Sequence, residues 1–306
     1  MYDIIVVGGG AAGLTAALYA RRNNKSVLVI EKNGFGGQIT YSPKVENYPG
    51  IKQMAGTEFA DWLLDQALEQ GAEVELENVI GVEARGAVKR VITEEGGEYE
   101  AKAVIIASGV KHRMLGIEGE YELVGNGISF CAVCDGEFYR GKNVVVIGGG
   151  NSALQEAVLL SENCAKVTVV QDLDFFTGES KLQELLFRRP NVEKYTGMAV
   201  EGFITDGGAL KGVRVVKKAT GEKTKIPCDG AFVAIGLIPE NSVFKEIAAL
   251  DDFGYFASGE DCATKTPGVF CAGDCRAKSV RQLTTATADG AVAAVAACRY
   301  IDAMRA

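Results

Sequence analysis

The stretch of the chain best suited to chemistry is Cys131-Ala132-Val133-Cys134-Asp135-Gly136. Two thiols separated by two residues can open and close a disulfide, and this spacing tends to favour the thiolate form of one sulfur, which is the form that attacks. The carboxyl group that follows the pair, Asp135, can be desolvated and raised in pKa, which suits it to exchange protons with thiols. The sequence therefore predicts a redox dithiol in which Cys131, Cys134 and Asp135 are catalytic.

A cysteine pair of this spacing could instead be half of a zinc site. Structural zinc usually needs four ligands, often supplied by two such pairs, and the sequence has no second CxxC. Cys271 and Cys275 are spaced as CxxxC and do not form a second pair of this kind. We therefore predict no metal, and we expect the remaining cysteines to be small buried residues: Cys164, Cys228, Cys262 and Cys298.

A glycine-rich turn near the start of the chain must position a nucleotide. The apolar run 4–7 is followed by Gly8, Gly10 and Gly13, then by a predicted helix over 11–23, a strand over 26–30 and Glu31. These distances match the dinucleotide fingerprint, in which glycines allow a pyrophosphate to approach a helix N-terminus and the acid binds a ribose hydroxyl.

The same pattern recurs over residues 144–170. Gly148 corresponds to Gly8, Ala153 to Gly13 and Gln171 to Glu31, without a gap. An internal duplication of this kind predicts two dinucleotide-binding units. Helical spacing of apolar residues predicts further helices over 57–70 and 281–300, and apolar runs predict strands near 73–76, 81–84, 88–93, 103–107, 231–235 and 267–271.

Length and composition limit the function further. A chain of 306 residues favours two domains, and a net charge of −8 argues against nucleic acid as a partner. No apolar run is long enough to cross a bilayer, and the start of the chain reads as a strand, not a signal peptide. We therefore expect a cytoplasmic protein without membrane contact, whose cysteines lie in a reducing compartment.

Several motifs together resemble those of the low-molecular-weight thioredoxin reductases over essentially the full chain: Gly36-Gly37-Gln38, Glu46-Asn47-Tyr48-Pro49-Gly50, Ala107-Ser108-Gly109, the CxxC segment, Gly236 with Pro239, Gly273-Asp274 and Arg281-Gln282. The resemblance implies an α/β fold with two Rossmann-like, three-layer dinucleotide-binding domains, the second inserted into the first. The FAD-binding domain would comprise 1–112 and 246–306, and the inserted pyridine-nucleotide-type domain, 113–245, would carry the CxxC. A homodimer is also implied.

The resemblance assigns roles to individual residues. Gln38 and Asn47 would lie along the flavin of FAD, Asp274 on its ribityl chain and Gln282 near its ring, with Gly37, Gly109 and Arg281 completing the cofactor site. Cys134 would meet the flavin, and Cys131 would attack the disulfide of thioredoxin. The single histidine, His112, lies in a predicted linker, so the site must work without the C-terminal histidine of the larger glutathione-reductase type.

The electron donor is a separate question, because the second fingerprint departs from the family pattern. NADPH-using members carry a His-Arg-Arg segment after the second strand to bind the 2′-phosphate. Here residues 167–180 contain no basic side chain, and Asp172 and Asp174 would repel a phosphate. NADH is disfavoured by Gln171 in place of an acid, although Asp172 could compensate.

This departure resembles the ferredoxin-dependent flavin thioredoxin reductases, so we expect reduced ferredoxin as donor. Ferredoxins are generally acidic, and a basic cluster is available to dock one: Lys211, Arg214, Lys217, Lys218, Lys223 and Lys225. The same residues could instead form a solvated sheet edge. Two alternatives remain: an NADH- or NADPH-dependent thioredoxin reductase, and a flavoprotein redox sensor or oxidase without reductase activity.

Overall fold

The computed structural model describes residues 1–42 and 44–304, which form two compact units. Among the described residues, unit 1 comprises those of 1–111 and 238–304, and unit 2 comprises 112–237. Two short strands, β7 (Lys111–His112) and β16 (Leu237–Ile238), pair where the chain passes between the units. The second boundary lies eight residues before the predicted one at 245/246. The reason is that Asn241 and Phe244 belong to unit 1: the buried Asn241 amide donates to the Gly254 and Cys275 carbonyls, and Phe244 lies in the core of that unit.

Unit 1 is built on one mixed sheet in the order β3-β2-β1-β6-β5-β4, with β17 also paired to β6. Strands β1, β2, β3, β6 and β17 pair in parallel, whereas β4, β5 and β6 form an antiparallel meander. The elements of this unit are β1 (Tyr2–Val7), α1 (Ala11–Arg22), β2 (Val27–Glu31), η1 (Gly37–Tyr41), α2 (Gly56–Glu69), β3 (Glu73–Leu76), β4 (Val79–Arg85), β5 (Val88–Thr93), β6 (Glu98–Ile106), η3 (Ser242–Phe244), β17 (Val269–Cys271), η4 (Gly273–Cys275) and α7 (Leu283–Ala303).

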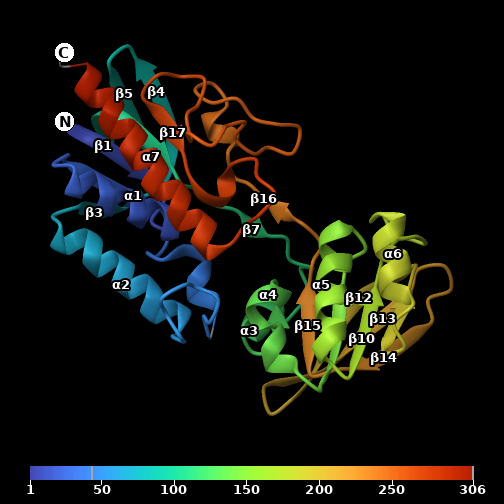
Figure 1. Cartoon of the computed structure of the whole chain (residues 1–306). Helices are drawn as coiled ribbons and strands as arrows, with labels where there is room; N and C mark the ends of the chain where they lie inside the picture. Colours follow the sequence, from blue (N-terminus) through green and yellow to red (C-terminus); the bar gives the residue numbers. More distant parts are fainter. Residues whose placement is uncertain (43, 305–306) are drawn as a thin grey trace. The chain divides into compact units, whose positions relative to one another are not determined.

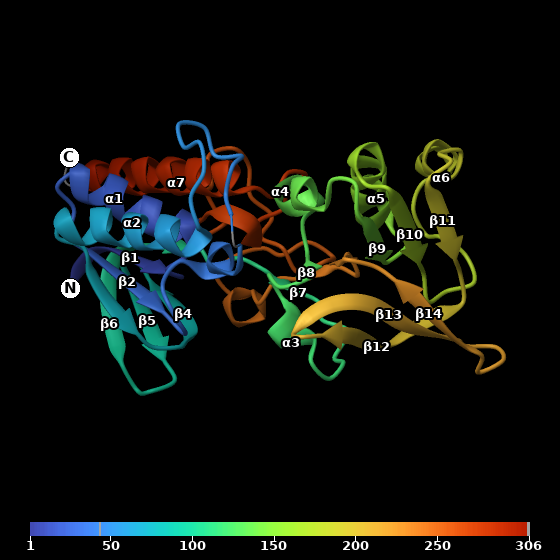
Figure 2. The same cartoon turned by 90° about the horizontal axis from the view of Figure 1, so that it is seen from below.

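Both faces of the unit 1 sheet are covered, which explains why its central strands are continuously apolar. Side chains alternate along β1, so that Ile4 and Val6 pack into one core and Ile5 and Val7 into the other. The first core is closed by α1 and α7, which approach closely at Gly290, where a Cβ would lie 2.2 Å from the Ala12 carbonyl oxygen. Figure 2 shows α1, α2 and α7 together on one side of the sheet, in which β5 and β4 continue from β6.

Unit 2 repeats this arrangement around a parallel sheet in the order β11-β10-β9-β15-β8 (Figure 1). Helices α5 and α6 cover one face, and the antiparallel sheet β12-β13-β14 covers the other. The elements are α3 (Glu120–Leu123), β8 (Ile128–Ser129), α4 (Ala132–Asp135), η2 (Gly136–Tyr139), β9 (Asn143–Ile147), α5 (Asn151–Asn163), β10 (Lys166–Val170), α6 (Ser180–Phe187), β11 (Val192–Tyr195), β12 (Met198–Asp206), β13 (Ala209–Lys217), β14 (Lys223–Pro227) and β15 (Gly230–Val233).

The predicted α/β class with two Rossmann-like domains is confirmed, and the duplication extends to backbone detail. Gly8 and Gly148 both have positive φ, of 107° and 134°, and a Cβ at either position would lie 2.3 Å from a carbonyl oxygen, of Ala107 and Ala234 respectively. The predicted helix over 281–300 begins later, at Leu283. Gln282 is instead its N-cap and forms a capping box with Thr285.

Candidate active site

The first glycine turn of unit 1 connects β1 to α1 and has the shape required by a dinucleotide. Gly13 allows the turn to close, because a Cβ there would lie 1.9 Å from the Gly8 carbonyl oxygen. Gly10 is the N-cap of α1 and has no side-chain cap, so the first N–H groups of the helix remain free for an anion. At the end of β2, the Glu31 carboxylate accepts hydrogen bonds from the N–H groups of Gly9, at 2.7 Å, and Asn33, at 3.0 Å.

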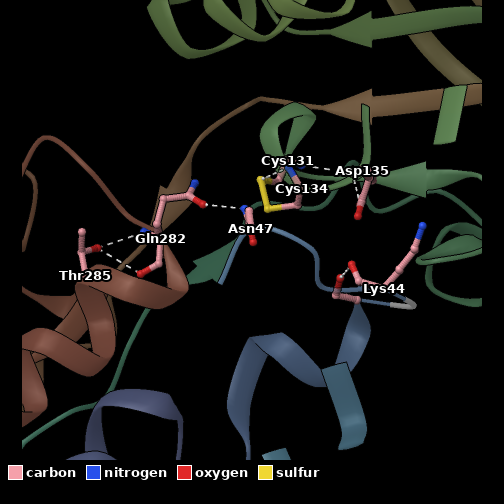
Figure 3. The surroundings of a disulfide bond; sticks show 9 residues. Lys44, Asn47, Cys131, Cys134, Asp135, Gln282 and Thr285 are labelled. Atoms are coloured by element: carbon pink, nitrogen blue, oxygen red, sulfur yellow. Dashed lines mark hydrogen bonds between the residues drawn. A yellow bond between two sulfur atoms is a disulfide. The ribbon is translucent and has the colours of Figure 1, made fainter. Parts of the chain in front are cut away.

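Other predicted FAD residues of unit 1 lie close to one another. Gly37 opens η1 beside Gly10, so that a Cβ on Gly37 would lie 3.1 Å from the Gly10 Cα, and Gln38 follows with an exposed side chain. The Asn47 amide donates to Gln282 Oε1 at 3.3 Å, which brings together two segments 235 residues apart (Figure 3).

The acidic turn of unit 1 also has features that suit a cofactor. Asp274 lies in η4, and its Oδ1 is enclosed without a hydrogen-bond partner, although Lys278 Nζ lies 3.4 Å away. Burial raises the pKa of Asp274 despite the nearby Lys278 ammonium. Arg281 donates to the Asp274 carbonyl at 3.2 Å and lies over the Tyr255 ring. An enclosed carboxylate oxygen without a partner, together with the open glycine turn, fits the hydroxyl-rich chain and pyrophosphate of FAD.

A buried charge cluster beside this turn was not predicted from the sequence. Arg276 donates to both carboxylate oxygens of Asp289, at 2.8 and 3.2 Å, and also to the Ser258 and Gly259 carbonyls. Lys278 bonds the same carboxylate at 3.1 Å. Burial alone would raise the pKa of Asp289, but the Arg276 hydrogen bond and the Lys278 charge hold it below the ordinary value. The available signal in the sequence was Asp289, an acidic residue within the alanine-rich part of α7.

In unit 2, Cys131 and Cys134 form a disulfide at the start of α4, with their Cα atoms 5.3 Å apart (Figure 3). Cys131 is the N-cap of this short helix, and its sulfur accepts a hydrogen bond from the Cys134 N–H at 3.2 Å. Both cysteines are half-buried, whereas Val133 between them is 60% exposed. The start of α4 thus presents the apolar Val133 side chain at the surface, beside a half-buried disulfide.

The predicted acid, Asp135, is the last residue of α4 and is tied to the disulfide through Ser129. The Ser129 hydroxyl donates to Asp135 Oδ2 at 2.6 Å and accepts from the Cys131 N–H at 3.1 Å. Asp135 Oδ1 is enclosed and has no hydrogen-bond partner. Burial raises the pKa of Asp135, and the Ser129 hydrogen bond opposes this effect only in part. Ser129 was missed by sequence reasoning, because its contact depends on the turn between β8 and α4.

The second glycine turn has the same backbone but different side chains. The Gln171 side chain lies against Gly149, where a Cβ would be 2.5 Å from the carboxamide carbon. Its oxygen accepts from the Asp172 N–H at 3.2 Å, and its nitrogen donates to the Phe175 carbonyl at 3.3 Å. Lys218 Nζ lies 3.3 Å from Asp172 Oδ2, so the structure brings to this loop a basic side chain that the local sequence lacks.

The basic cluster predicted over 211–225 is partly neutralised. Lys218 pairs with Asp172, and Lys223 pairs with Glu201 at 2.6 Å, both on the surface. Arg214 and Lys225 face each other across β13 and β14 without an ion pair of either side chain in the described residues. The cluster therefore offers fewer free charges than the sequence suggested.

The other cysteines of the described residues are reduced and buried. Burial raises the pKa of Cys271 to about 12 and that of Cys275 to about 11, which keeps both as neutral thiols. Among the residues that the structure describes, no group of three or more His, Cys, Asp or Glu side chains is placed to hold a metal. His112 is not a solvated linker residue: its ring stacks on Phe130 at 4.4 Å, and burial lowers its pKa to about 4.

Two dinucleotide turns and a redox disulfide with an adjacent buried acid define a nucleotide-dependent disulfide oxidoreductase. Residues 2–290 match the family described as pyridine nucleotide-disulphide oxidoreductases, and the chain belongs to this family. It is an FAD-dependent disulfide oxidoreductase. In the described residues, no helix is both long and apolar enough to span a membrane.

Within this family, the chain is similar over its full length to thioredoxin reductases. The chain is 39% identical over 305 residues to the thioredoxin reductase of Listeria monocytogenes, a match that covers 100% of this chain and 95% of that protein. It is 38% identical to the thioredoxin reductase of Bacillus subtilis, with 100% and 96% covered. The crystal structure of thioredoxin reductase from Streptococcus pyogenes matches with a TM-score of 0.94, 37% identity and 99% of both chains covered. The resemblance to thioredoxin reductases is confirmed, whereas these relatives give no support to the ferredoxin-dependent subgroup.

Proposed function

We propose that the protein is a thioredoxin reductase, which passes electrons through FAD to the Cys131–Cys134 disulfide and on to the disulfide of thioredoxin. The observation that carries this proposal is the disulfide itself, held at the start of α4 with Asp135 bound to it through Ser129. We take thioredoxin as the substrate because the full-length relatives are thioredoxin reductases. Nothing in these relatives favours the alternative of a redox sensor or oxidase.

FAD would be held by unit 1. We assign its pyrophosphate to the turn of Gly8, Gly10 and Gly13, and its adenosine ribose to Glu31. The remaining contacts of the flavin, its ribityl chain and its ring would come from Gly37, Gln38, Asn47, Gly109, Asp274, Arg281 and Gln282. When bound, FAD supplies the electron pair that opens the disulfide.

The dithiol would carry out the exchange with thioredoxin. The hydrogen bond from the Cys134 N–H favours the thiolate form of Cys131, which supports Cys131 as the attacking sulfur. Cys131 would form a mixed disulfide with one thioredoxin sulfur and release the other as a thiolate. The Cys134 thiolate would then attack the Cys131 sulfur, displace the thioredoxin sulfur still bonded to it and restore the Cys131–Cys134 bond. Asp135 would take up and return the protons of these thiols.

A turnover assay tests this proposal. Protein loaded with FAD and reduced chemically in stoichiometric amounts should convert oxidised thioredoxin to its dithiol, one per reduced active site, without any physiological donor. The control is the protein with Cys131 and Cys134 alkylated after reduction. If the unmodified reduced protein left thioredoxin oxidised, the proposed substrate would be wrong.

For the physiological donor, the family description favours a pyridine nucleotide over ferredoxin, which reverses the order of preference given by the sequence. We propose NADH in preference to NADPH. Residues 167–180 have no basic side chain to bind a 2′-phosphate, and Lys218, which the structure brings to this loop, is already paired with Asp172. Asp172 would take the ribose hydroxyl in place of the missing acid at Gln171.

Ferredoxin is the second candidate donor, and a specific observation favours it. Both polar atoms of the Gln171 carboxamide are used within its own loop, so the second turn offers an incoming ribose less than the first turn does. Rapid mixing of the oxidised protein with NADH, NADPH and reduced ferredoxin in separate experiments would decide. Rapid bleaching of the flavin by NADH supports the first proposal, and bleaching by ferredoxin alone overturns it. The homodimer implied by the resemblance also remains a proposal, which sedimentation would test.

A further inference from the structure

A second, partly buried acid belongs to the dithiol region of unit 2. Glu156 lies in α5, and its Oε2 is enclosed without a hydrogen-bond partner, as is Oδ1 of Asp135. In the described residues, neither carboxyl forms an ion pair. Two enclosed carboxyl oxygens without partners are unusual in a folded protein and call for an explanation.

Helix α5 packs against the chain that follows the disulfide, and this packing places Glu156 on the face of α5 that is turned toward Asp135. Gly136 follows Asp135 directly, and a Cβ at Gly136 would lie 3.2 Å from Leu160 Cδ2. Leu160 is four residues after Glu156, so both side chains project from the same face of α5, with Glu156 one turn nearer the N-terminus. The electrostatic influence of Asp135 on Glu156 agrees with this placement.

The pKa of Glu156 is raised to about 8, mainly by burial and to a smaller extent by repulsion from Asp135. Of the other titratable groups near the pair, Tyr139 of η2 has its pKa raised to about 12 and is neutral, while Cys228 and Asp229 act on Tyr139. On the same helix, Glu162 is bonded to Arg189 at the surface. Near neutral pH the two partly buried carboxyls therefore share at least one proton.

We propose that Glu156 is a positioning residue that stores a proton for Asp135 during opening of the Cys131–Cys134 disulfide. Reduction breaks one S–S bond, takes up the two electrons supplied by the flavin and requires two protons to give two thiols. Asp135 delivers one proton to the thiolate formed, Glu156 replaces it through a bridging water, and solvent supplies the second proton and later restores Glu156. The inference rests on the dithiol chemistry proposed above.

The first test observes the proton itself. Protein labelled with ¹³C at the glutamate side-chain carboxyl should show one resonance that titrates near pH 8, and this resonance should be missing in Glu156→Gln. The wild-type titration decides even if the variant does not fold, and it needs neither thioredoxin nor an electron donor. A failure of the proposed function would therefore leave this result unchanged. The absence of any glutamate carboxyl titrating above about pH 6 would overturn the proposal.

The second test is the pH dependence of the rate at which the disulfide opens in a single turnover. At pH 7 we expect Glu156→Gln to slow this step about tenfold, less than the loss typical of a direct acid. At pH 9 the two proteins should react at similar rates, because Glu156 of the wild type has then lost its own proton. Glu162→Gln, the same change on the exposed side of α5, is the control and should match the wild type at both pH values. An equal loss at both pH values for Glu156→Gln would indicate a purely structural role and overturn the proposal.

Discussion

Replacing Gly10 by alanine separates cofactor binding from folding. Gly10 has φ −81° and ψ −173°, which alanine adopts readily, and beyond its two chain neighbours the nearest described atoms to an added Cβ would be those of Gly36 and Gly37, at 3.8 Å. Gly8 and Gly13 are unsuitable for this purpose, because a Cβ at either would lie about 2 Å from a carbonyl oxygen and disturb the fold. Any large effect of Gly10→Ala must therefore come from a ligand that approaches this backbone.

The size of the effect follows from the geometry. Loss of the glycine N-cap should cost about 1 kcal/mol of stability or less. The methyl group would stand where the FAD pyrophosphate must approach the start of α1. Forcing one extra carbon into a close contact costs about 1–3 kcal/mol, so the affinity for FAD should fall roughly 5- to 150-fold.

The assay is titration of apoprotein with FAD, followed by the quenching of flavin fluorescence. Gly150→Ala is the matched control: it occupies the equivalent position of the second turn, with φ −85°, and its Cβ would lie 3.7 Å from Thr177 Oγ1. This control should bind FAD as the wild type does, while losing reduction by NADH if a pyridine nucleotide binds there. Unchanged FAD affinity in Gly10→Ala, or a comparable loss in Gly150→Ala, would refute the assignment of FAD to the first turn.

Three further predictions concern chemistry and stability. Cys131→Ser and Cys134→Ser should each abolish thioredoxin reduction and keep FAD, as measured by turnover and the flavin spectrum; substantial turnover in either variant would point to another electron route. Because folded Glu156 keeps its proton to about pH 8 and the unfolded chain releases it near 4.5, its contribution should lower stability as pH rises between these values, by at most about 5 kcal/mol. Thermal melts of Glu156→Gln should lack this fall, and parallel melting curves for the two proteins would contradict it. Asp289→Asn leaves Arg276 buried and unpaired and should cost about 3–5 kcal/mol in denaturant unfolding at pH 7, whereas a loss below 1 kcal/mol would show that the pair is dispensable.

Much of the fold could be predicted because its determinants are local in the sequence. The turn after β1 needs a positive φ at Gly8 and a close approach of the Gly8 carbonyl to Gly13. Only glycine satisfies both requirements, so the spacing of the glycines locates the turn in the sequence. The continuous apolar runs of β1 and β9 likewise indicate strands buried on both faces. The start of α7 was placed too early because Arg281 and Gln282 are compatible with a helix. The capping box between Gln282 and Thr285 fixes the first residue of α7, and its formation depends on side-chain geometry.

The parts of the site that escaped prediction depend on contacts between distant segments. Ser129 binds Asp135 only because α4 folds back beside the end of β8. Glu156 reaches the same region only because α5 packs against Gly136, and its place on an ordinary helix gave no sign of this. Lys278, Arg276 and Asp289 were separate charges in the sequence and became a cluster when α7 packed beside η4.

The two glycine turns have the same backbone, but the side chains beside them give the two turns different capacities to bind a nucleotide. At the first turn, Glu31 at the end of β2 accepts the Gly9 N–H and keeps further acceptor capacity for a ribose hydroxyl. At the second, Gln171 takes the equivalent place at the end of β10, but its carboxamide is satisfied by Asp172 and Phe175. A nucleotide at the second turn must then gain its binding energy from the glycine backbone and from Asp172, which Lys218 already holds. Asp172→Asn should consequently weaken reduction by NADH severalfold and leave reduction by ferredoxin unchanged, so this single variant links the choice of donor to one carboxylate. A rate of flavin bleaching by NADH equal to that of the wild type would refute the assignment of the ribose to Asp172.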